Sequence, residues 1–228
     1  MKATLTDYVF STLALGLLLG LSLGGVVLLL PLSRHLFADY HILFDLGFGR
    51  LLYGVLTAVL VRAMLRVRPI VPGAYGEQSP VFTYWKLITV VYRLGQGALR
   101  PFIPVFLQPL VEKLYGARMG GDVALGGVID DPYMVSVGDG TALGTASMVC
   151  GSYIGDGKLN CGYIKIGCNV TVGPNSVIFP GTEIGDDAVL MVGSYLMPGT
   201  RVPAGETWRG NPARKWLQPT GARAVQVE

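Results

Sequence analysis

The chain has 228 residues and a net charge of +3, and it is 51% hydrophobic but only 14% charged. About 25% of the residues in an average soluble protein are charged, so the low charge, together with 32 glycines, indicates a membrane segment and a Gly-rich repeat. A nucleic-acid binder would show a dense Lys/Arg face, which is absent, and three cysteines are an odd number that favours reduced thiols over a disulfide framework.

The first predicted element is an uncharged apolar run over residues 8–30. As a helix it would be about 35 Å long, enough to cross a bilayer, and it is about twice as long as the apolar part of a signal peptide. A second apolar run, 42–65, carries Asp45, Arg50 and Arg62, and it could cross the bilayer with its charged ends snorkelling. We predict a transmembrane helical hairpin over 1–68, with a second helix lying in the interface as the alternative.

Basic residues follow the second apolar run at Arg62, Arg66 and Arg68. By the positive-inside rule they place everything after them in the cytoplasm. We therefore expect an integral protein of the inner or plasma membrane that contacts membrane lipid.

Residues 69–116 read as a linker and interfacial helices. Prolines and glycines fill 68–80, and an amphipathic helix is predicted over 81–99, with Trp85 on its apolar face and Lys86, Arg93 and Arg100 recurring every seven residues. Such a helix suits the membrane interface, and a helix packed on the following domain is the alternative. A short helix is predicted over 110–115.

Residues 117–214 carry a six-residue repeat, and a fixed period dictates the architecture. Aliphatic side chains recur every sixth residue, most of them followed by a small residue, which predicts a coil with three flat sides whose rungs bury one continuous core. The aliphatic positions are Met119, Leu125, Val137, Leu143, Val149, Ile166, Val172, Ile178, Ile184, Leu190, Leu196 and Val202, and Trp208 ends the series.

Two stretches interrupt the repeat. Asp130, Asp131 and Pro132 are expected to bulge out as a loop, and residues 152–165 are expected to leave the coil as a loop, where function often resides. Asp156, Lys158 and Asn160 in that loop are candidates for binding an acceptor or replacing a catalytic base. The pattern stops after residue 213, and 215–228 is predicted to be a C-terminal tail.

The hexads, with the closing segment Gly210-Asn211-Pro212-Ala213-Arg214, resemble the left-handed β-helix hexapeptide-repeat acyltransferases. Trp208–Ala213 is similar to a segment of the membrane-attached branch, which includes exopolysaccharide acetyltransferases and terminal domains of poly-lysine-type peptide synthetases. The resemblance implies an all-β left-handed parallel β-helix, a homotrimer with sites between neighbouring coils, and acyl-CoA as cosubstrate. The expected donor-binding residues are Gly193, Arg209, Gly210, Asn211, Pro212, Ala213, Arg214 and Lys215, on the grounds of free backbone amides and cationic side chains. The alternative is that they only terminate the coil.

One departure from the family matters most. The resemblance implies a histidine base on the coil, just after the residue at Cys150, where this chain has Gly151 and Ser152. The two histidines, His35 and His41, lie in the helical region, and His41 is the histidine candidate if the hairpin joins the site. The three-histidine zinc site of γ-class carbonic anhydrases is therefore excluded, and Cys161-x6-Cys168 is not a usual zinc spacing, so no metal site is expected. Cys150 has no histidine near it in sequence to activate it as a nucleophile.

Two functions remain open. The first is a membrane-anchored acyltransferase acting on a membrane-proximal or lipid-linked acceptor such as a saccharide. The second is a catalytically inactive trimeric scaffold or partner-binding module at the membrane, because the coil histidine is absent.

Overall fold

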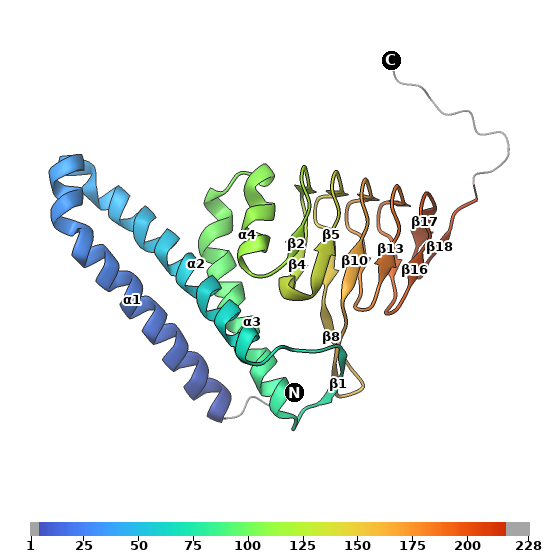
Figure 1. Ribbon diagram of the computed structural model, residues 1–228, viewed down its shortest axis with the longest axis horizontal. Coiled ribbons are helices and arrows are strands. Elements are labelled where there is room, and N and C mark those ends of the chain that lie inside the picture. The colour runs from blue at the N-terminus through green and yellow to red at the C-terminus, as the bar shows by residue number, and fades with distance from the viewer. Residues whose placement is uncertain (1–4, 218–228) are drawn as a thin grey trace, which may run out of the picture.

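The computed structural model describes residues 5–217, so most of the predicted C-terminal tail lies outside the described residues. Four α-helices precede a β-coil, and Figure 1 shows them as an N-terminal hairpin followed by two helices beside the first turn of the coil. The helices are α1 (Leu5–Phe37), α2 (His41–Val67), α3 (Pro80–Leu99) and α4 (Gln108–Leu114), with 3-10 turns η1 (Ala38–Tyr40), η2 (Arg100–Phe102), η3 (Val105–Leu107) and η4 (Pro132–Met134).

The hairpin α1–α2 follows from two long apolar runs separated by a short polar break. The stretch Leu5–Val67 is long and apolar enough to cross a membrane by length and composition. Much of its apolar surface is uncovered by the rest of the chain, with Leu13 65% and Leu28 83% exposed. The helical hairpin is thus as predicted, and its crossing of a bilayer stays a prediction.

Two arginines of α2, Arg50 and Arg62, donate hydrogen bonds to the ends of neighbouring helices, and the snorkelling of the charged ends of this run in a bilayer stays a prediction. Arg50 donates through Nη2 to the Gly97 carbonyl at 3.0 Å and through Nε to the Ala98 carbonyl, at the end of α3. Arg62 donates in the same way to the Lys113 and Leu114 carbonyls at the end of α4, the latter at 2.8 Å. The last carbonyls of a helix lack intrahelical partners and carry partial negative charge, so each arginine caps a helix.

Helix α3 packs against α2 on one side and the coil on the other. Ile88, Tyr92 and Leu99 are buried on the face that the periodicity predicted. The basic stripe does not face outward to headgroups, because each cation pairs with a carboxylate on a different element: Lys86 with Asp7 of α1, Arg93 with Asp130 of the coil at 2.9 Å, and Arg100 with Glu112 of α4. The packed helix is thus the alternative that these contacts support.

The close approach of α2 and α3 depends on a glycine. A Cβ at Gly95 would lie 2.0 Å from both the Thr57 and the Tyr115 hydroxyl oxygens. Those two hydroxyls are 2.7 Å apart, and the Tyr115 hydroxyl also donates to the Gly54 carbonyl at 3.0 Å. Burial raises the pKa of Tyr115 to about 12, so the phenol stays protonated and ties the start of the coil to the hairpin.

The coil has three parallel sheets, as predicted. The first, order β16-β13-β10-β5-β2, presents Arg118, Ser136, Lys165, Glu183 and Arg201 outward, and we call it the charged sheet. The second, order β18-β17-β14-β11-β6-β3, presents small residues, and the third, order β15-β12-β7-β4, presents Val128, Met148, Val177 and Tyr195 and is called the apolar sheet.

The strands of the coil are short because the chain turns a corner after one or two inward side chains. They are β2 (Arg118–Met119), β3 (Ala124–Leu125), β4 (Val128–Asp130), β5 (Val135–Val137), β6 (Ala142–Leu143), β7 (Met148–Cys150), β10 (Ile164–Ile166), β11 (Thr171–Val172), β12 (Val177–Ile178), β13 (Glu183–Ile184), β14 (Val189–Leu190), β15 (Tyr195–Leu196), β16 (Arg201–Val202), β17 (Thr207–Gly210) and β18 (Ala213–Lys215). The inward aliphatic residues form one core cluster, which Trp208 closes at the end.

The small residue that follows most of the aliphatic ones is explained by the next turn of the coil. A Cβ at Gly173 would lie 2.5 Å from the Val192 amide nitrogen, and a Cβ at Gly185 would lie 2.5 Å from the Ala204 nitrogen. Real Cβ atoms do not approach backbone so closely, so the rung spacing of the coil requires glycine at these corners.

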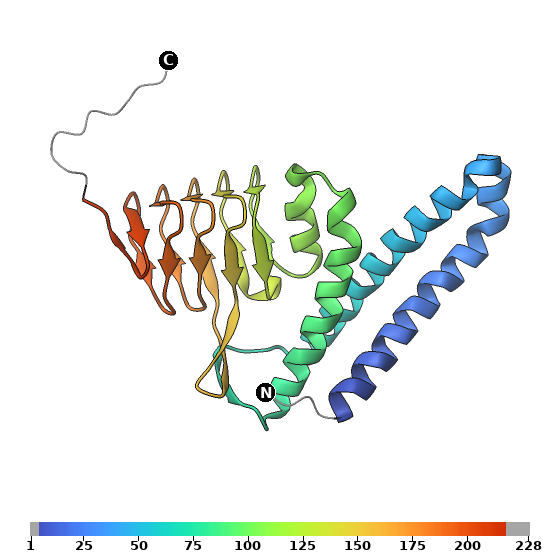
Figure 2. The same cartoon turned by 180° about the vertical axis from the view of Figure 1, so that it is seen from behind.

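The second predicted interruption is an ordered hairpin rather than a loop. Strands β8 (Ser152–Gly155) and β9 (Lys158–Cys161) pair antiparallel, and β1 (Gly73–Gly76), from the segment read as a linker, adds to β9. The Gly162 amide donates to the Gly151 carbonyl at 3.0 Å and closes the base of the hairpin, after which β10 resumes the coil. Figure 2 shows this hairpin projecting from the coil toward the start of α3.

Candidate functional site

The corner between the apolar sheet and the charged sheet is where the family resemblance implies a histidine. In this chain Gly151 stands there, and a Cβ at Gly151 would lie 2.9 Å from the Asp131 Cβ and 3.1 Å from the Met134 Cβ. A histidine therefore does not fit at position 151 unless the neighbouring turn moves. Atoms of Asp131 and Met134 fill the space that such a side chain would need.

Asp131 was expected in a loop that bulges outward, and the structure contradicts this. Its side chain is turned into the protein, and the residue is only 1% exposed. Trp85 donates to it at 3.2 Å and Tyr133 at 2.9 Å, while the Ser152 hydroxyl donates to its other oxygen. Sequence reasoning missed this site because the unit at Asp131 breaks the hexad pattern, and only the fold shows that α3 and the hairpin cover it.

Burial raises the pKa of Asp131, and the hydrogen bonds from Ser152, Tyr133 and Trp85 oppose that rise. The carboxyl has a donor at each oxygen and no exposed edge, so a substrate hydroxyl or amine cannot reach it in this conformation. Asp131 thus ties α3, η4 and the β8–β9 hairpin to the coil, and we call these residues with Asp131 the Asp131 cluster (Trp85, Asp131, Tyr133 and Ser152).

The raised pKa of Asp131 predicts how the free energy of unfolding depends on pH. Because Asp131 holds its proton to a higher pH when folded than its ordinary value of 3.8, the native chain binds more protons than the unfolded chain just above that pH. The free energy of unfolding should therefore fall as the pH rises from about 4 through the folded pKa, and then level off. Asp131→Asn should flatten this slope in unfolding titrations followed by circular dichroism.

Asp156→Asn, in the exposed turn of the β8–β9 hairpin, is the matched control and should keep the wild-type slope. Glu112 is also buried, and its pKa is raised mainly by burial, so part of the slope should survive in Asp131→Asn. An unchanged slope in Asp131→Asn would mean that Asp131 is ionised as easily in the folded chain as in the unfolded one.

Cys150 and Cys161 lie beside this cluster and are 8% and 7% exposed. Burial, with the nearby charge of Asp130 or Asp131 adding to it, raises the pKa of both thiols to about 12. The thiolate is the nucleophilic form, so neither cysteine is activated for acyl transfer. Asp130, opposite Cys150 in the β4–β7 pair, is the partly exposed carboxylate at this corner, and Arg93 holds it at 2.9 Å.

The predicted acceptor residues lie on the β8–β9 hairpin. Asp156 and Lys158 are exposed at or next to its turn, and Asn160 lies opposite both Tyr153 and Ala74, with its side chain donating to the Lys158 carbonyl at 3.3 Å. The hairpin holds these three residues together but carries them away from the coil (Figure 2). Their role as acceptor ligands or as a base stays a prediction.

The predicted donor-binding residues gather at the last turn of the coil. Strands β17 and β18 form an antiparallel pair in which Arg209 lies opposite Arg214 and Gly210 opposite Ala213, with Asn211 and Pro212 exposed in the turn between them. Lys215 pairs with Glu206 at 2.5 Å, and Ala213 is 2% exposed and covers the end of the core. The Gly193 amide, expected to be free, donates to the Pro174 carbonyl at 2.9 Å, so Gly193 offers no donor there.

His41, the remaining histidine candidate, lies at the turn between α1 and α2, at the end of the hairpin away from the coil (Figure 1). Its Nδ1 lies 2.7 Å from the Ala38 carbonyl, and it lines an apolar hollow of about 540 Å³ with Asp45 and Arg50. This histidine therefore does not join the Asp131 cluster or the last turn of the coil.

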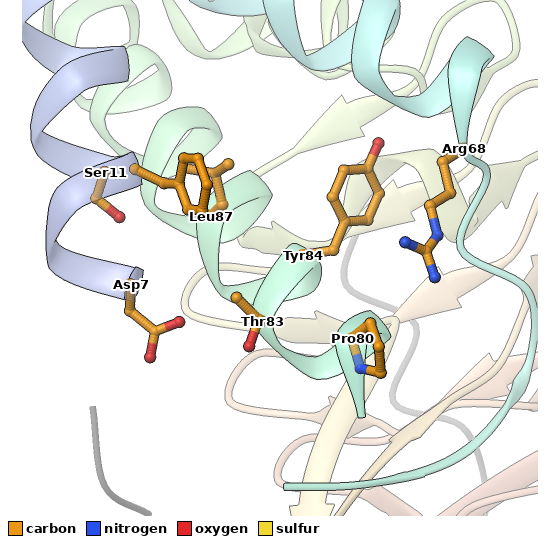
Figure 3. Close-up of a pocket in the computed structure, with 8 residues that line it drawn as sticks. Asp7, Ser11, Arg68, Pro80, Thr83, Tyr84 and Leu87 are labelled. Carbon is orange, nitrogen blue, oxygen red and sulfur yellow. The ribbon is translucent and has the colours of Figure 1, made fainter. Parts of the chain in front are cut away.

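A smaller hollow of about 260 Å³ lies between the start of α1, the start of α3 and the end of α2. Figure 3 shows Asp7 and Arg68 on opposite sides of it, with Tyr84 between them. The Arg68 guanidinium lies 5.8 Å from the centre of the Tyr84 ring, and the Tyr84 hydroxyl donates to the Met64 carbonyl at 2.6 Å. These contacts fasten the helices to one another.

Comparison with known proteins supports the fold. Residues 163–198 match the family described as the hexapeptide repeat of succinyl-transferase. The delta-poly-L-ornithine synthetase of Acinetobacter baumannii (strain AB307-0294) is 29% identical over 180 residues, which cover 73% of this chain and 13% of that protein. The mitochondrial gamma carbonic anhydrase 2 of Arabidopsis thaliana is 31% identical over 133 residues, which cover 50% of this chain and 43% of that protein.

The chain thus spans less than half the length of either relative. Among solved structures, a galactoside acetyltransferase in complex with coenzyme A superposes with a TM-score of 0.50 at 18% identity, covering 69% of this chain and 90% of that one, and this likeness concerns the fold alone. The six-residue repeat, the three-sided parallel coil and the match over residues 163–198 together show the left-handed β-helix fold of hexapeptide-repeat proteins, and the chain is similar to the acyltransferases that have this fold.

Proposed function

We propose that this protein is a membrane-anchored acyltransferase that takes an acyl group from acyl-CoA and transfers it to a membrane-proximal acceptor, such as a lipid-linked saccharide. The similarity of the chain to hexapeptide-repeat acyltransferases supports acyl transfer, and the apolar hairpin α1–α2 supports attachment to a membrane. We propose a membrane-proximal acceptor because the β-coil and the apolar hairpin α1–α2 are joined in one chain.

The observation that carries the proposal is the cationic end of the coil. Arg209 and Arg214 stand directly opposite each other on β17 and β18, and both are exposed. Like charges directly opposite across a strand pair are destabilising, and within residues 5–217 neither has a carboxylate partner. Arg209 is held by stacking over Trp216, 5.3 Å from its centre. The diphosphate of a CoA ester is the kind of anion that such a pair of forked cations binds.

A homotrimer is part of the same proposal. The apolar sheet leaves Val128 38% and Met148 40% exposed, next to the sheet of small residues. Burying such flat, weakly polar sheets against neighbouring copies would remove apolar surface from water. The charged sheet would then stay outside, and the corner at Asp130 and Gly151 would lie at the edge of the contact.

Donor binding is tested by titrating acetyl-CoA into the detergent-solubilised protein in a calorimeter. Arg209→Ala and Arg214→Ala should each weaken binding about tenfold, since a hydrogen bond to a charged group contributes about 1.5–3 kcal/mol. Lys158→Ala, exposed near the turn of the β8–β9 hairpin, is the control and should bind as the wild type does.

The alternative, a catalytically inactive trimeric scaffold, is favoured by one observation: the corner expected to hold the catalytic base holds a buried Asp131 with its oxygens occupied. If no CoA ester binds at millimolar concentration while the protein remains folded, the acyltransferase proposal fails and the scaffold stands. If CoA binds, replacing Asp130, the partly exposed carboxylate at the corner, with Asn tests for a substitute base by its effect on turnover but not on donor affinity.

A further inference from the structure

Two hollows meet where the end of α2 reaches the first turns of the coil. The first, of about 450 Å³, is lined by Arg62, Leu65, Arg66 and Gly116, and the second, of about 370 Å³, includes Ser136, Tyr163 and Lys165 in its lining. Arg118 and Tyr133 line both. We call the joined hollows the basic groove, defined by Arg62, Arg66, Arg118, Tyr133, Tyr163 and Lys165.

The basic groove concentrates positive charge without neutralising it. Its lining includes three arginines and a lysine but no carboxylate. Within residues 5–217, the side chains of Arg66 and Arg118 have no hydrogen-bond or ion-pair partner. Arg62 uses Nε and Nη2 on the carbonyls that end α4, which leaves Nη1.

Two carboxylates that contact residues of the groove, Glu183 and Asp131, do not neutralise its positive charge. Glu183 lies 3.5 Å from the Lys165 amine, but both side chains are well exposed, and such pairs contribute little. Asp131 lies behind Tyr133 and faces the interior, where the Tyr133 hydroxyl donates to it. The positive charges of these side chains repel one another, and an anion bound between them would offset that repulsion.

The groove also offers the donors that a phosphate requires. An arginine guanidinium can donate two parallel hydrogen bonds to phosphate oxygens, and Arg66 on α2 and Arg118 on β2 both line the first hollow. Arg62 ties α2 to the end of α4, four residues before Arg118. The Ser136 and Tyr163 side chains add hydroxyl groups along the second hollow.

We infer that the basic groove is a binding site for a phosphate or diphosphate group, separate from the cationic end of the coil and independent of acyl transfer. Two sources share this chemistry: the headgroup of a lipid, reached at the end of the apolar helix α2, and a free phosphorylated molecule. Binding there uses Arg66 and Arg118 as the principal ligands.

The test uses the full chain in non-ionic detergent, with Arg209→Ala and Arg214→Ala introduced so that the last turn of the coil cannot bind the probe. Inorganic pyrophosphate is titrated at low ionic strength in a calorimeter. In this background, Arg66→Ala and Arg118→Ala should each weaken binding about tenfold. Arg201→Ala, on the same sheet but two turns along the coil, and 3.4 Å from Glu183, should leave binding unchanged.

A second titration identifies the source of the phosphate. Micelles doped with phosphatidic acid are compared with micelles doped with phosphatidylcholine, whose headgroup is neutral overall. Binding of pyrophosphate and of phosphatidic acid, both lost with Arg118→Ala, would support a lipid ligand, and binding of pyrophosphate alone would support a free phosphorylated ligand. The inference is overturned if neither probe binds, or if Arg201→Ala weakens binding as much as Arg118→Ala. Because the pyrophosphate titration omits CoA, its failure would leave the donor site at Arg209 and Arg214 untouched.

Discussion

Replacing Arg100 with methionine should lower the free energy of unfolding by about 3–5 kcal/mol, because it leaves a buried carboxylate without its cation. Glu112 is 0% exposed, and its oxygens are held by Arg100 and by the Gln96 amide at 2.9 Å. Without Arg100, burial would raise the pKa of Glu112 further. The loss should be measured by thermal or denaturant unfolding in detergent.

The sign of the pH dependence distinguishes this cause from lost packing. With the folded pKa of Glu112 raised above its unfolded value, the native chain gains stability as the pH falls toward that value, so the deficit of Arg100→Met should shrink in acid. Adding Glu112→Gln should recover part of the loss. Lys165→Met, which breaks an exposed pair 3.5 Å long, is the matched control and should cost at most about 1 kcal/mol. Equal losses in the two variants would contradict a buried ion pair at Glu112.

Gly173→Ala should destabilise the coil by about 3 kcal/mol, at the upper end of the usual cost of forcing extra atoms into a packed interior. The new Cβ would lie 2.5 Å from the Val192 nitrogen and 2.6 Å from the Met191 carbonyl carbon, which belong to the next turn. Backbone cannot move aside as a flexible side chain can. The midpoint of thermal unfolding, followed by circular dichroism, measures the effect.

The control is Gly97→Ala, an exposed glycine within α3 with nothing within 4 Å of its Cβ position. Alanine is favoured over glycine inside a helix by roughly 0.5–1 kcal/mol, so this variant should be slightly more stable than the wild type. If Gly173→Ala proves as harmless as Gly97→Ala, the rungs of the coil are not held at the spacing described.

Much of the fold could be predicted because its determinants are local and periodic. The inward position recurs every sixth residue, and both Leu125 and Ile178 are 0% exposed, as the repeat requires. The helical hairpin and the apolar face of α3 were predicted for the same reason. The β1 strand was not, since its pairing with β9 joins residues far apart in the chain, and neither strand repeats a pattern.

The candidate site was predicted less well. Arg209 and Arg214 could be named from the closing segment of the coil, but their direct opposition depends on the antiparallel pairing of β17 with β18. Asp131 was placed in a loop that bulges outward because its unit breaks the six-residue pattern. Its burial depends on Trp85, 46 residues earlier, which no local pattern connects to it.

The amino-acid sequence by itself determined the three-sided coil, the apolar helical hairpin and the absence of a histidine from the coil, because period, hydropathy and composition are properties of the chain alone. Only the tertiary structure decided which partners the charged side chains contact. Arg50 and Arg62 cap the helices α3 and α4, and the three cations of the basic stripe, Lys86, Arg93 and Arg100, each pair with a carboxylate. Within residues 5–217 the side chains of Arg66 and Arg118 have no hydrogen-bond or ion-pair partner. A charged side chain can pair with any opposite charge or carbonyl within its reach, so its partner is fixed by which elements pack together and not by its neighbours in the sequence.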